Sequence, residues 1–539
     1  MKIIFVTGGV LSGIGKGISA ASIGVILKSM GYTVFCQKFD GYLNVDPWTM
    51  SPFQHGEVFV TEDGTETDLD LGHYERFLDI PLTELSSFTS WKLYEELIRR
   101  ERRGDFLGGT VQIVPHLTDL VKEKIRDGFQ SSEADISIVE IGGTVGDMEN
   151  EYILESARQI RTELWSENVI FVHVALLPFL LASKELKTKP IQHSIRTLMG
   201  YGIVPDFLVV RADSDIPDDT LDKIAKASWL PRQHVLGSPT LDSIYRVPIE
   251  YAKSHIGESV VKALALVEKT PHLGSWEQLV ENIDASTDTL RIGMIGKYVE
   301  LEDAYYSVNE AMKSAGFFFQ KKVKLIFIEA ESIEKQWTTK LESLDGICVP
   351  WWFGGRGIEG MLLAAEYARV HDVPYLGICL GSQIMAIEFA RNVLELRDAN
   401  SEEFDPDGKN NVVHIMENQK WLTKKWGTMR LGKYECIVRT GTLADRLYSA
   451  HGQTTDWLLR ISERHRHRYE FNRIYRDRME ERGFIVSATS PDGTLAEIVE
   501  LKDHPFMIGT QAHPEFHSRP TQPHPLFLGF IDASIRKSW

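Results

Sequence analysis

Residues 2–17 read KIIFVTGGVLSGIGKG, and this stretch decides the fold of the first half of the chain. Lys2–Thr7 is apolar and β-branched, which predicts a strand, and a helical pattern follows from Ser19 to Met30. A glycine-rich turn between a strand and a helix lets backbone N–H groups approach a phosphate, and the helix N-terminus adds partial positive charge. The stretch therefore predicts a nucleotide-binding α/β unit in which Lys16 reaches the terminal phosphates; a tight turn without a ligand is the alternative.

The loop differs from the standard P-loop in two places. Val10 stands where the first glycine is usual, and Gly17 replaces the Ser or Thr that ligates magnesium. A metal ion would therefore need carboxylates from elsewhere, and magnesium typically takes one or two together with substrate phosphates. Asp70, in the acidic run TEDGTETDLDLGH, and Glu140, at the end of an apolar strand, are the candidates. For Asp68 and Asp70, a solvated loop is the alternative.

Strands alternate with helices along the whole chain, which is typical of α/β folds with a parallel sheet. A first series of strands is expected at 2–7, 33–38, 136–140, 169–175 and 207–211. A second series is expected at 291–296, 324–328, 346–350, 375–379 and 506–511, with helices at 305–315, 358–370 and 382–391. The segment between the series is polar and broken by Pro271 and Gly274. We expect two α/β domains, a P-loop-like parallel-sheet domain over 1–267 and a second domain over 290–539, joined by a linker over 268–289.

The second domain contains the motif that predicts a specific chemistry most clearly. Cys379 lies in YLGICLGSQ, between an expected strand and an expected helix, with glycines at 377 and 381. A sharp strand-to-helix turn exposes a nucleophile, and the following N–H groups favour its thiolate. His513 and Glu515, in QAHPEF, would serve as the base and the group that orients it. The motif predicts a cysteine nucleophile; a buried structural cysteine is the alternative.

Two basic stretches leave open whether they bind a substrate or are solvated. KTKPIQH, Lys187 to His193, offers two lysines that flank a threonine and could hold a second triphosphate, or could form a solvated loop. ERHRHRYE, Glu463 to Glu470, is expected to be a loop that orders carboxylate substrates, or a solvated turn.

Composition limits the partners. The chain has 59 Lys and Arg against 76 Asp and Glu, a formal charge of −17, which argues against nucleic acid as a partner. Its 4 cysteines are scattered, as in a reduced protein. The most apolar stretch, 169–182, is interrupted by His173 and Pro178 and is too short to span a membrane, which takes about 20 apolar residues. We expect a cytoplasmic protein that binds neither nucleic acid nor membrane.

Taken in order, GGVLSGIGKG, SPFQHGEVFVTEDGTETDLDLGHYERF, VEIGGTVGD, KTKP, GICLGSQ, ERHRHRYE and QAHPEF resemble the CTP synthase family over nearly the whole chain. The glutaminase motifs are shared by class I glutamine amidotransferases, and the run from Ser51 to Phe77 is more specific. The resemblance implies that Mg²⁺-ATP phosphorylates O4 of UTP and that ammonia, released from glutamine through a Cys379 thioester, then displaces phosphate. It also implies activation by GTP, feedback inhibition by CTP, a homotetramer and filaments.

The resemblance also implies roles for individual residues. Lys38 belongs to the synthase site, and Asp70 and Glu140 are the metal ligands. ATP is expected to contact Gly13, Ile14, Gly15, Lys16, Gly17, Ile18 and Asp70. UTP or CTP is expected to contact Ser12, Asp147, Met148, Glu149, Lys187, Thr188, Lys189, Pro190, Ile191, Gln192 and Lys223. Glutamine is expected to contact Trp352, Leu380, Gly381, Ser382, Gln383, Glu403 and Arg468.

The chain departs from the family where members read PGGFG, because it reads Pro-Trp-Trp-Phe-Gly over 350–354. Trp352 stands where a backbone N–H helps to form the oxyanion hole, and a bulky residue tolerates φ > 0 badly. Tryptophan also replaces glycine at positions 48, 91 and 426. Two further hypotheses therefore stay open: a catalytically weakened, filament-forming homologue that binds nucleotides, and a different glutamine-dependent amidoligase.

Overall fold

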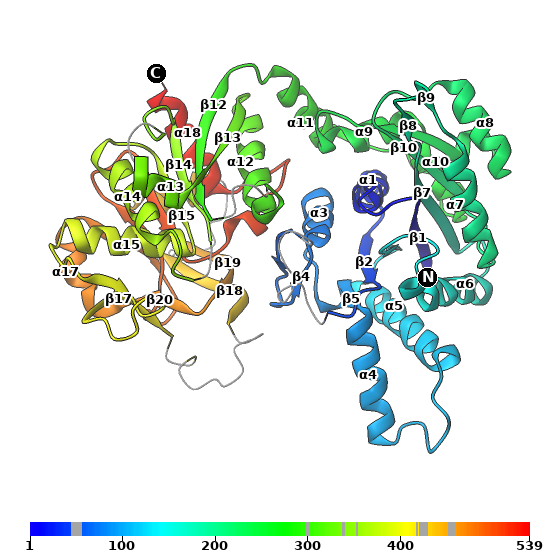
Figure 1. The fold of residues 1–539 in the computed structure, drawn as a ribbon, viewed down its shortest axis with the longest axis horizontal. Helices are drawn as coiled ribbons and strands as arrows, with labels where there is room; N and C mark the ends of the chain where they lie inside the picture. Colours follow the sequence, from blue (N-terminus) through cyan, green and yellow to red (C-terminus); the bar gives the residue numbers. More distant parts are fainter. Residues whose placement is uncertain are drawn as a thin grey trace. The chain divides into compact units, whose positions relative to one another are not determined.

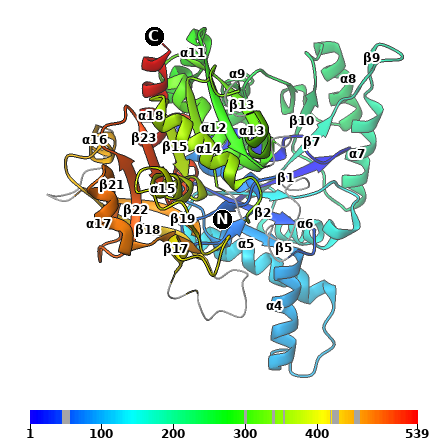
Figure 2. The ribbon, with the colours of Figure 1, turned by 60° about the vertical axis from the view of Figure 1, so that its left-hand side comes forward.

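The computed structural model describes residues 1–44, 56–297, 302–336, 340–351, 354–416, 419, 429–450 and 459–538. The chain forms two compact units, shown in Figures 1 and 2. The first unit comprises Met1–Met50 and Asp70–Val280, and the second comprises Ser51–Leu69 and Glu281–Trp539. Each is an α/β unit, as the alternation of strands and helices predicts.

The first unit is built on a seven-stranded sheet in the order β11-β10-β7-β1-β6-β2-β5, in which every neighbouring pair is parallel. Because β1 lies between β6 and β7, the loops after these three strands open at one edge, where ligands bind in open α/β sheets. The strands are β1 (Lys2–Gly9), β2 (Val34–Asp40), β5 (Ser87–Thr89), β6 (Ile136–Ile141), β7 (Val169–Leu176), β10 (Phe207–Ala212) and β11 (Val235–Pro239).

Helices cover both faces of this sheet, so its strands are buried apolar runs. Helix α1 packs with α9 and α10 on one face, while α5 and α6 bury Ile3, Phe5 and Phe171 on the other. Figures 1 and 2 show α4 extending away from the sheet. The helices are α1 (Lys16–Ser29), α3 (Leu69–Leu78), α4 (Ser90–Arg103), α5 (Thr118–Ser132), α6 (Glu151–Leu164), α7 (Lys189–Gly200), α8 (Asp218–Ser228), α9 (Val247–Lys253) and α10 (Ile256–Ala263).

The second unit has a nine-stranded sheet in the order β13-β12-β14-β15-β23-β22-β21-β18-β19. Its pairs are parallel from β13 to β23 and antiparallel from β23 to β19. The strands are β12 (Thr289–Gly296), β13 (Lys322–Glu329), β14 (Gly346–Val349), β15 (Tyr375–Ile378), β18 (Arg430–Val438), β19 (Leu459–His467), β21 (Phe484–Thr489), β22 (Ala496–Leu501) and β23 (Met507–Thr510). A smaller sheet contains β16 (Ala399–Ser401), β17 (Asn410–Ile415) and β20 (Tyr469–Phe471).

Helices also flank this sheet. They are α12 (Tyr306–Phe318), α13 (Ala330–Gln336), α14 (Ile358–Val370), α15 (Leu380–Asn392), α16 (Leu443–Ala450), α17 (Arg476–Glu480) and α18 (Pro525–Lys537). Within the described ranges of the chain, every helix is too short or too polar to cross a membrane.

The structure differs in two places from the two contiguous domains and the linker that the sequence predicts. The short hairpin of β3 (Phe59–Val60) and β4 (Glu66–Thr67) belongs to the second unit although it lies early in the chain. The expected linker contains α11 (Gly274–Ala285), and Trp276 of this helix packs on Phe77 with ring centroids 5.1 Å apart. The change from the first unit to the second at residue 280 falls inside the stretch expected as the linker.

The interpretation of ERHRHRYE as a solvated turn or substrate loop is wrong. Residues 463–467 lie in β19 and are buried, and Arg464 and Arg466 are among the largest fully buried side chains. The sheet accommodates these charges because carboxylates are buried beside them, Glu66 next to Arg466 among them. A charged run therefore forms an interior strand.

Candidate functional sites

The glycine-rich loop ends directly at the first turn of α1. The N-cap residue Gly15 has φ 82°, and no side chain caps this helix end. Gly13 also has positive φ, and a Cβ built on it would meet nothing within 4 Å. Lys16 is buried and donates from Nζ to the carbonyl of Gly143 at 2.8 Å. The uncapped N–H groups of this helix end are the kind of donors that bind phosphate.

Two predicted metal ligands meet beside this loop. A Cβ built on Gly17 would lie 3.1 Å from Oδ1 of Asp70 and 3.4 Å from Oε2 of Glu140. Asp70 lies in the first turn of α3, and Glu140 lies near the end of β6. Both carboxylates therefore face the same space, and a side chain at position 17 would crowd them.

The charges around this pair suit a divalent cation. Burial, and then the neighbouring Asp70, raise the pKa of Glu140. Burial acts in the same direction on Asp70, but the ion pair with Lys38 holds its pKa below the usual value. Tyr74 also donates its hydroxyl hydrogen to Glu140. The buried Glu140 and the partly exposed Asp70, next to the glycine-rich loop, match the donors that Mg²⁺ prefers, so the residues fit the ion.

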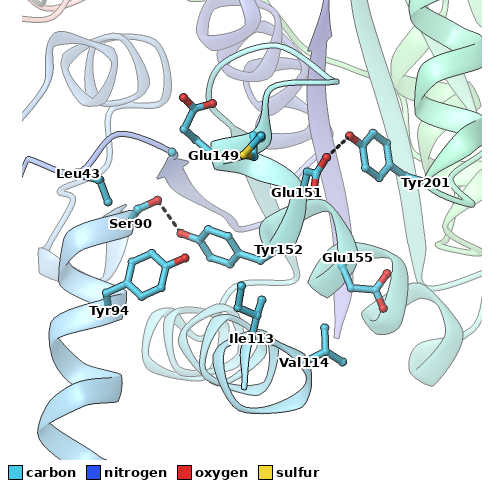
Figure 3. A pocket seen from close by; sticks show the side chains of 12 residues that line it. Leu43, Ser90, Tyr94, Ile113, Val114, Glu149, Glu151, Tyr152, Glu155 and Tyr201 are labelled. Carbon is cyan, nitrogen blue, oxygen red and sulfur yellow. Dashed lines mark hydrogen bonds between the residues drawn. The ribbon is translucent and has the colours of Figure 1, made fainter. Parts of the chain in front are cut away.

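A cavity of about 600 Å³ lies elsewhere in the first unit and is lined by Met148 and Glu149, two of the predicted UTP or CTP contacts. Figure 3 shows Tyr152 hydrogen-bonded to Ser90, at 2.7 Å, and Tyr201 donating to Glu151, at 2.9 Å. The third predicted residue, Asp147, accepts a hydrogen bond from N of Thr144 at 2.7 Å. The lining is apolar and acidic, which suits the uncharged part of a nucleotide better than its phosphates.

The predicted triphosphate residues gather around the start of α7. Lys187 pairs with Glu185, and both Lys187 and Lys223 lower the pKa of that carboxylate, so the two lysines lie near each other. Gln192 donates from Nε2 to Oγ1 of Thr188 at 3.3 Å. Lys189 and Pro190 lie in the first turn of α7, whereas Ile191 is a core residue. Ser12 is exposed in the glycine-rich loop, and Ile18 is half-buried in the first turn of α1.

The second unit contains the expected nucleophile elbow. Cys379 is the N-cap of α15, with φ 53° and ψ −101°, directly after β15. A Cβ on Gly381 would lie 2.0 Å from the carbonyl of Val349, and one on Gly377 would lie 2.5 Å from the backbone of Gly381. Only glycine at these two positions lets the strand and helix approach so closely.

The proposed base and its orienting group lie together. Nδ1 of His513 and Oε1 of Glu515 are 2.7 Å apart, and both side chains are buried. Burial, and then Arg466, lower the pKa of His513 to about 3, and burial raises the pKa of Glu515 to about 8. Nε2 of His513 is buried without a hydrogen-bond partner among the described residues. The imidazole is therefore neutral and has a nitrogen that can take a proton.

The thiol itself is neutral in this state. Burial, and then Glu515, raise the pKa of Cys379 to about 12. Its Sγ contacts the carbonyl of Arg466, at 3.8 Å, and Nε2 of Gln511, at 3.6 Å. Catalytic hydrogen bonds are often absent before substrate binds, so this arrangement is compatible with Cys379 and His513 acting together on a bound amide.

The residues predicted to bind glutamine lie around this elbow. Leu380, Ser382 and Gln383 are buried in the first turn of α15, and Gln383 donates to the carbonyl of Tyr469 at 3.1 Å. Glu403 accepts from N of Gly354 at 2.9 Å, and Arg468 donates to Gln419 at 3.0 Å. Trp352 lies outside the described residues, as do Trp48 and Trp426.

Two of the tryptophans that replace family glycines are described. Trp351 is 7% exposed, and its ring lies 6.0 Å from that of His513 and 5.1 Å from the guanidinium carbon of Arg466. Trp91 is 42% exposed in the first turn of α4, where a large side chain meets no crowding. Trp351 thus fills space beside His513, the predicted base.

The sequence analysis missed two residues at these sites. Arg211, at the end of β10, donates from Nε to the carbonyl of Ile14 in the glycine-rich loop at 3.2 Å. Gln511 contacts the Cys379 thiol and accepts from Gln383 at 3.1 Å. Both follow a predicted strand at its carboxyl end, which is the signal that could have identified them.

The fold and the sites define a class of protein: a class I glutamine amidotransferase module joined to a nucleotide-binding α/β module. Family models match both parts, CTP synthase N-terminus over residues 2–266 and glutamine amidotransferase class-I over residues 300–533. The chain belongs to the CTP synthase family, and members of this family are carbon–nitrogen ligases.

Relatives of full length support this assignment. The CTP synthase of Carboxydothermus hydrogenoformans is 50% identical over 536 residues, which is 99% of each chain. That of Bacillus subtilis is 48% identical over 535 residues, 99% of this chain and 98% of the relative. Among solved structures, the glutaminase domain of Trypanosoma brucei CTPS with bound acivicin is 34% identical, with a TM-score of 0.42, and the match covers 46% of this chain and 95% of that one.

Proposed function

We propose that this chain forms CTP from UTP, using ATP, Mg²⁺ and ammonia that it releases from glutamine. The observation that carries the proposal is the presence, in one chain, of a buried cysteine–histidine–glutamate set and of a carboxylate pair beside a phosphate-binding helix end. The first set is suited to amide hydrolysis, and the second to phosphoryl transfer.

In the first unit, the residues of the glycine-rich loop, Gly13 to Ile18, hold the ATP phosphates. Asp70 and Glu140 would hold Mg²⁺, which neutralises charge that develops during phosphoryl transfer. Lys38 keeps Asp70 ionised for this role. The γ-phosphoryl group passes to O4 of UTP and ADP leaves; ammonia then attacks C4, and phosphate leaves to give CTP.

The pyrimidine nucleotide needs two kinds of contact. The acidic and apolar cavity lined by Met148 and Glu149 suits a base or ribose, because carboxylates accept hydrogen bonds from amino and hydroxyl groups. The triphosphate needs cations, which Lys187, Lys189 and Lys223 supply, together with the polar groups of Thr188 and Gln192. Product CTP would use the same contacts as an inhibitor.

In the second unit, Cys379 attacks the amide carbon of glutamine while Nε2 of His513 takes the thiol proton and passes it to the leaving ammonia. Water then hydrolyses the thioester to glutamate. Glu515 orients the imidazole through Nδ1. The backbone at 352 and Leu380 would stabilise the oxyanion, and Glu403, Gln383 and Arg468 would bind the amino-acid part of glutamine. GTP activation, a homotetramer and filaments complete the proposal by family analogy.

Chromatography of nucleotides tests the proposal. CTP should form from UTP, ATP and magnesium with ammonium chloride, and also with glutamine plus GTP. Replacing UTP with a carboxylate acceptor should abolish ATP hydrolysis, which separates this activity from that of another amidoligase. If no CTP forms with either nitrogen source, the proposal is wrong.

A second candidate is a homologue whose glutaminase is impaired. Trp351 favours it because its ring packs beside His513 and Arg466. Losing one oxyanion donor costs about 100- to 1,000-fold in rate. This candidate predicts CTP formation with ammonium chloride but not with glutamine, and a nucleotide-binding homologue without turnover predicts neither.

A further inference from the structure

The hairpin β3–β4 links the sequence of one module to the core of the other. Residues 56–69 fall inside the stretch matched by the CTP synthase N-terminus model, yet they belong to the second unit. Two arginines of β19 bind the hairpin: Nη1 of Arg464 donates to the carbonyl of Val60 at 3.0 Å, and Nε of Arg466 donates to Oε1 of Glu66 at 2.8 Å. Both arginines are almost fully buried, and Glu66 is 7% exposed.

The residues that hold the hairpin also contact the catalytic groups. The carbonyl of Arg466 lies 3.8 Å from Sγ of Cys379. The carbonyl of Arg464 accepts from N of His513 at 2.7 Å. A third connection runs through aromatic rings, because Phe59 packs on Phe516 at 5.0 Å and Phe516 stacks on the His513 ring at 5.2 Å. Each connection reaches a catalytic side chain through one intermediate residue.

We propose that Glu66 is a positioning residue for glutamine hydrolysis, because its buried ion pair with Arg466 fixes the strand backbone that contacts Cys379 and His513. The inference rests on the proposed function of the second unit. A buried arginine that loses its carboxylate is left as an uncompensated charge, so the strand around it must rearrange or admit water. That rearrangement would move the carbonyl of Arg466 away from the thiol.

The test compares Glu66→Gln with Glu435→Gln, a control in β18, the strand that pairs with β19. Glu435 pairs with Arg460 at 3.3 Å, and both side chains are more than half exposed, so its loss should change little. We expect Glu66→Gln to lower kcat for glutamine hydrolysis by about 100-fold, the cost of a small misplacement of reacting groups. CTP formation with ammonium chloride should stay within about twofold of the parent, because Glu66 and Arg466 both belong to the second unit.

A second readout separates positioning from a merely structural role. The rate at which iodoacetamide alkylates Cys379, followed by peptide mass against pH, should shift in Glu66→Gln and return toward the parent profile in Glu66→Asp. If Glu66→Gln does not fold, the double variant Glu66→Gln/Arg466→Met removes both buried charges and should fold without regaining glutaminase activity. Recovery of full activity in that variant would overturn the proposal.

Different results would contradict the proposed function and the role of Glu66. If the parent enzyme makes no CTP from ammonium chloride, the proposed function fails. If the parent uses both nitrogen sources and Glu66→Gln matches Glu435→Gln in kcat and in alkylation, the assigned role of Glu66 is wrong while the proposed function stands.

Two exposed tryptophans have backbone conformations that glycine adopts far more readily than other residues. Trp165, the C-cap of α6, has φ 67° and ψ 157°, a region populated almost only by glycine. Trp229, the C-cap of α8, has φ 56° and ψ 29°, the left-handed conformation in which helices commonly end on glycine. These side chains are 72% and 79% exposed, so packing does not offset the strain. Trp276 is different, since it is 6% exposed and packed on Phe77.

We infer that the natural protein carries glycine at position 165, and that the same holds at the tryptophans which replace family glycines, 48, 91, 351, 352 and 426.

The mass of one tryptic peptide tests whether the natural protein has glycine at position 165. The tryptic peptide that begins at Thr162, taken from the protein of its natural source, should have the mass expected for glycine at 165. In the recombinant chain, Trp165→Gly should raise the urea midpoint of unfolding, while the control Trp276→Gly should lower it. Tryptophan at 165 in the natural peptide would refute the inference.

Discussion

The Sγ atom of Cys379 is contacted by the side-chain amide of Gln511, whose Nε2 lies 3.6 Å away, and Oε1 of the same amide accepts from Gln383 at 3.1 Å. Gln511 therefore connects the nucleophile to a residue expected to bind glutamine. Because the amide N–H donates toward sulfur, this contact orders the thiol and also favours its thiolate.

Replacing Gln511 should affect one half-reaction only. In Gln511→Met, the thiol loses its amide neighbour and Gln383 loses its acceptor, so we expect kcat for glutamine hydrolysis to fall by about tenfold. The measurement is glutamate release under saturating glutamine. CTP formation with ammonium chloride is the control, and an equal fall in both rates would contradict the assignment.

Gly381 should tolerate no side chain. A Cβ there would lie 2.0 Å from the backbone carbonyl of Val349, which cannot move without shifting β14. Gly381→Ala should therefore abolish glutamine hydrolysis and lower the free energy of unfolding of the second unit by about 1–3 kcal/mol. Gly355→Ala is the matched control, because the nearest atom to its built Cβ is 3.8 Å away. Urea titration and glutaminase assays on both variants check this, and equal behaviour would contradict the elbow geometry.

Lys38 should matter equally for both nitrogen sources. Its ion pair with Asp70 keeps that carboxylate ionised against the effect of burial. In Lys38→Met, the pKa of Asp70 should rise and magnesium should bind more weakly, so CTP formation should fall by about 100-fold with ammonium chloride and with glutamine alike. Glutamine hydrolysis measured alone provides the control. A loss confined to the glutamine reaction would refute the role given to Lys38.

The first unit should lose stability in acid through His173. This imidazole is buried between Oγ1 of Thr7, at 2.9 Å, and Oγ of Ser194, at 2.8 Å. Burial, and then Lys16, lower its pKa from 6.5 to about 3. The folded state therefore favours the neutral ring, so this contribution is complete above pH 6.5 and is lost as pH falls toward 3, by about 1.4 kcal/mol for each pH unit.

Urea titrations between pH 7 and pH 4 measure that slope. His173→Gln should have a shallower dependence on pH than the parent, because the group that must take up a proton on unfolding is gone. His255→Gln, at a side chain that is 78% exposed, should keep the parent slope. If the free energy of unfolding of His173→Gln depends on pH as steeply as that of the parent, other groups cause the loss of stability in acid.

The five inner strands of the first sheet and the parallel strands of the second were predictable, because each is a buried apolar run bounded by glycine or polar residues. The edge strands β5 and β11 of the first sheet were not predicted. The elbow at Cys379 and the pair His513 and Glu515 were predictable for the same reason: each follows such a strand directly. The meeting of Asp70 with Glu140 was predicted from the missing P-loop hydroxyl, and the structure brings their oxygens to one place.

The antiparallel strands were not predictable from local pattern. In β19, buried arginines and histidines replace the apolar residues of an ordinary interior strand. The partners of the two arginines lie about 400 residues earlier in the chain, as with Arg466 and Glu66. Local sequence holds no information about so distant a carboxylate. The packing of the hairpin at 56–69 with the second unit was missed because contiguous domains are the simplest expectation.

The packing of the β3–β4 hairpin with β19 also limits where the chain can be divided by recombination. A crossover placed in the stretch between the two α/β series would join the β3–β4 hairpin of one parent to the β19 of another. Chimeras between family members should therefore keep their function only when residues 56–69 are inherited together with 281–539, although the two segments are far apart in the gene.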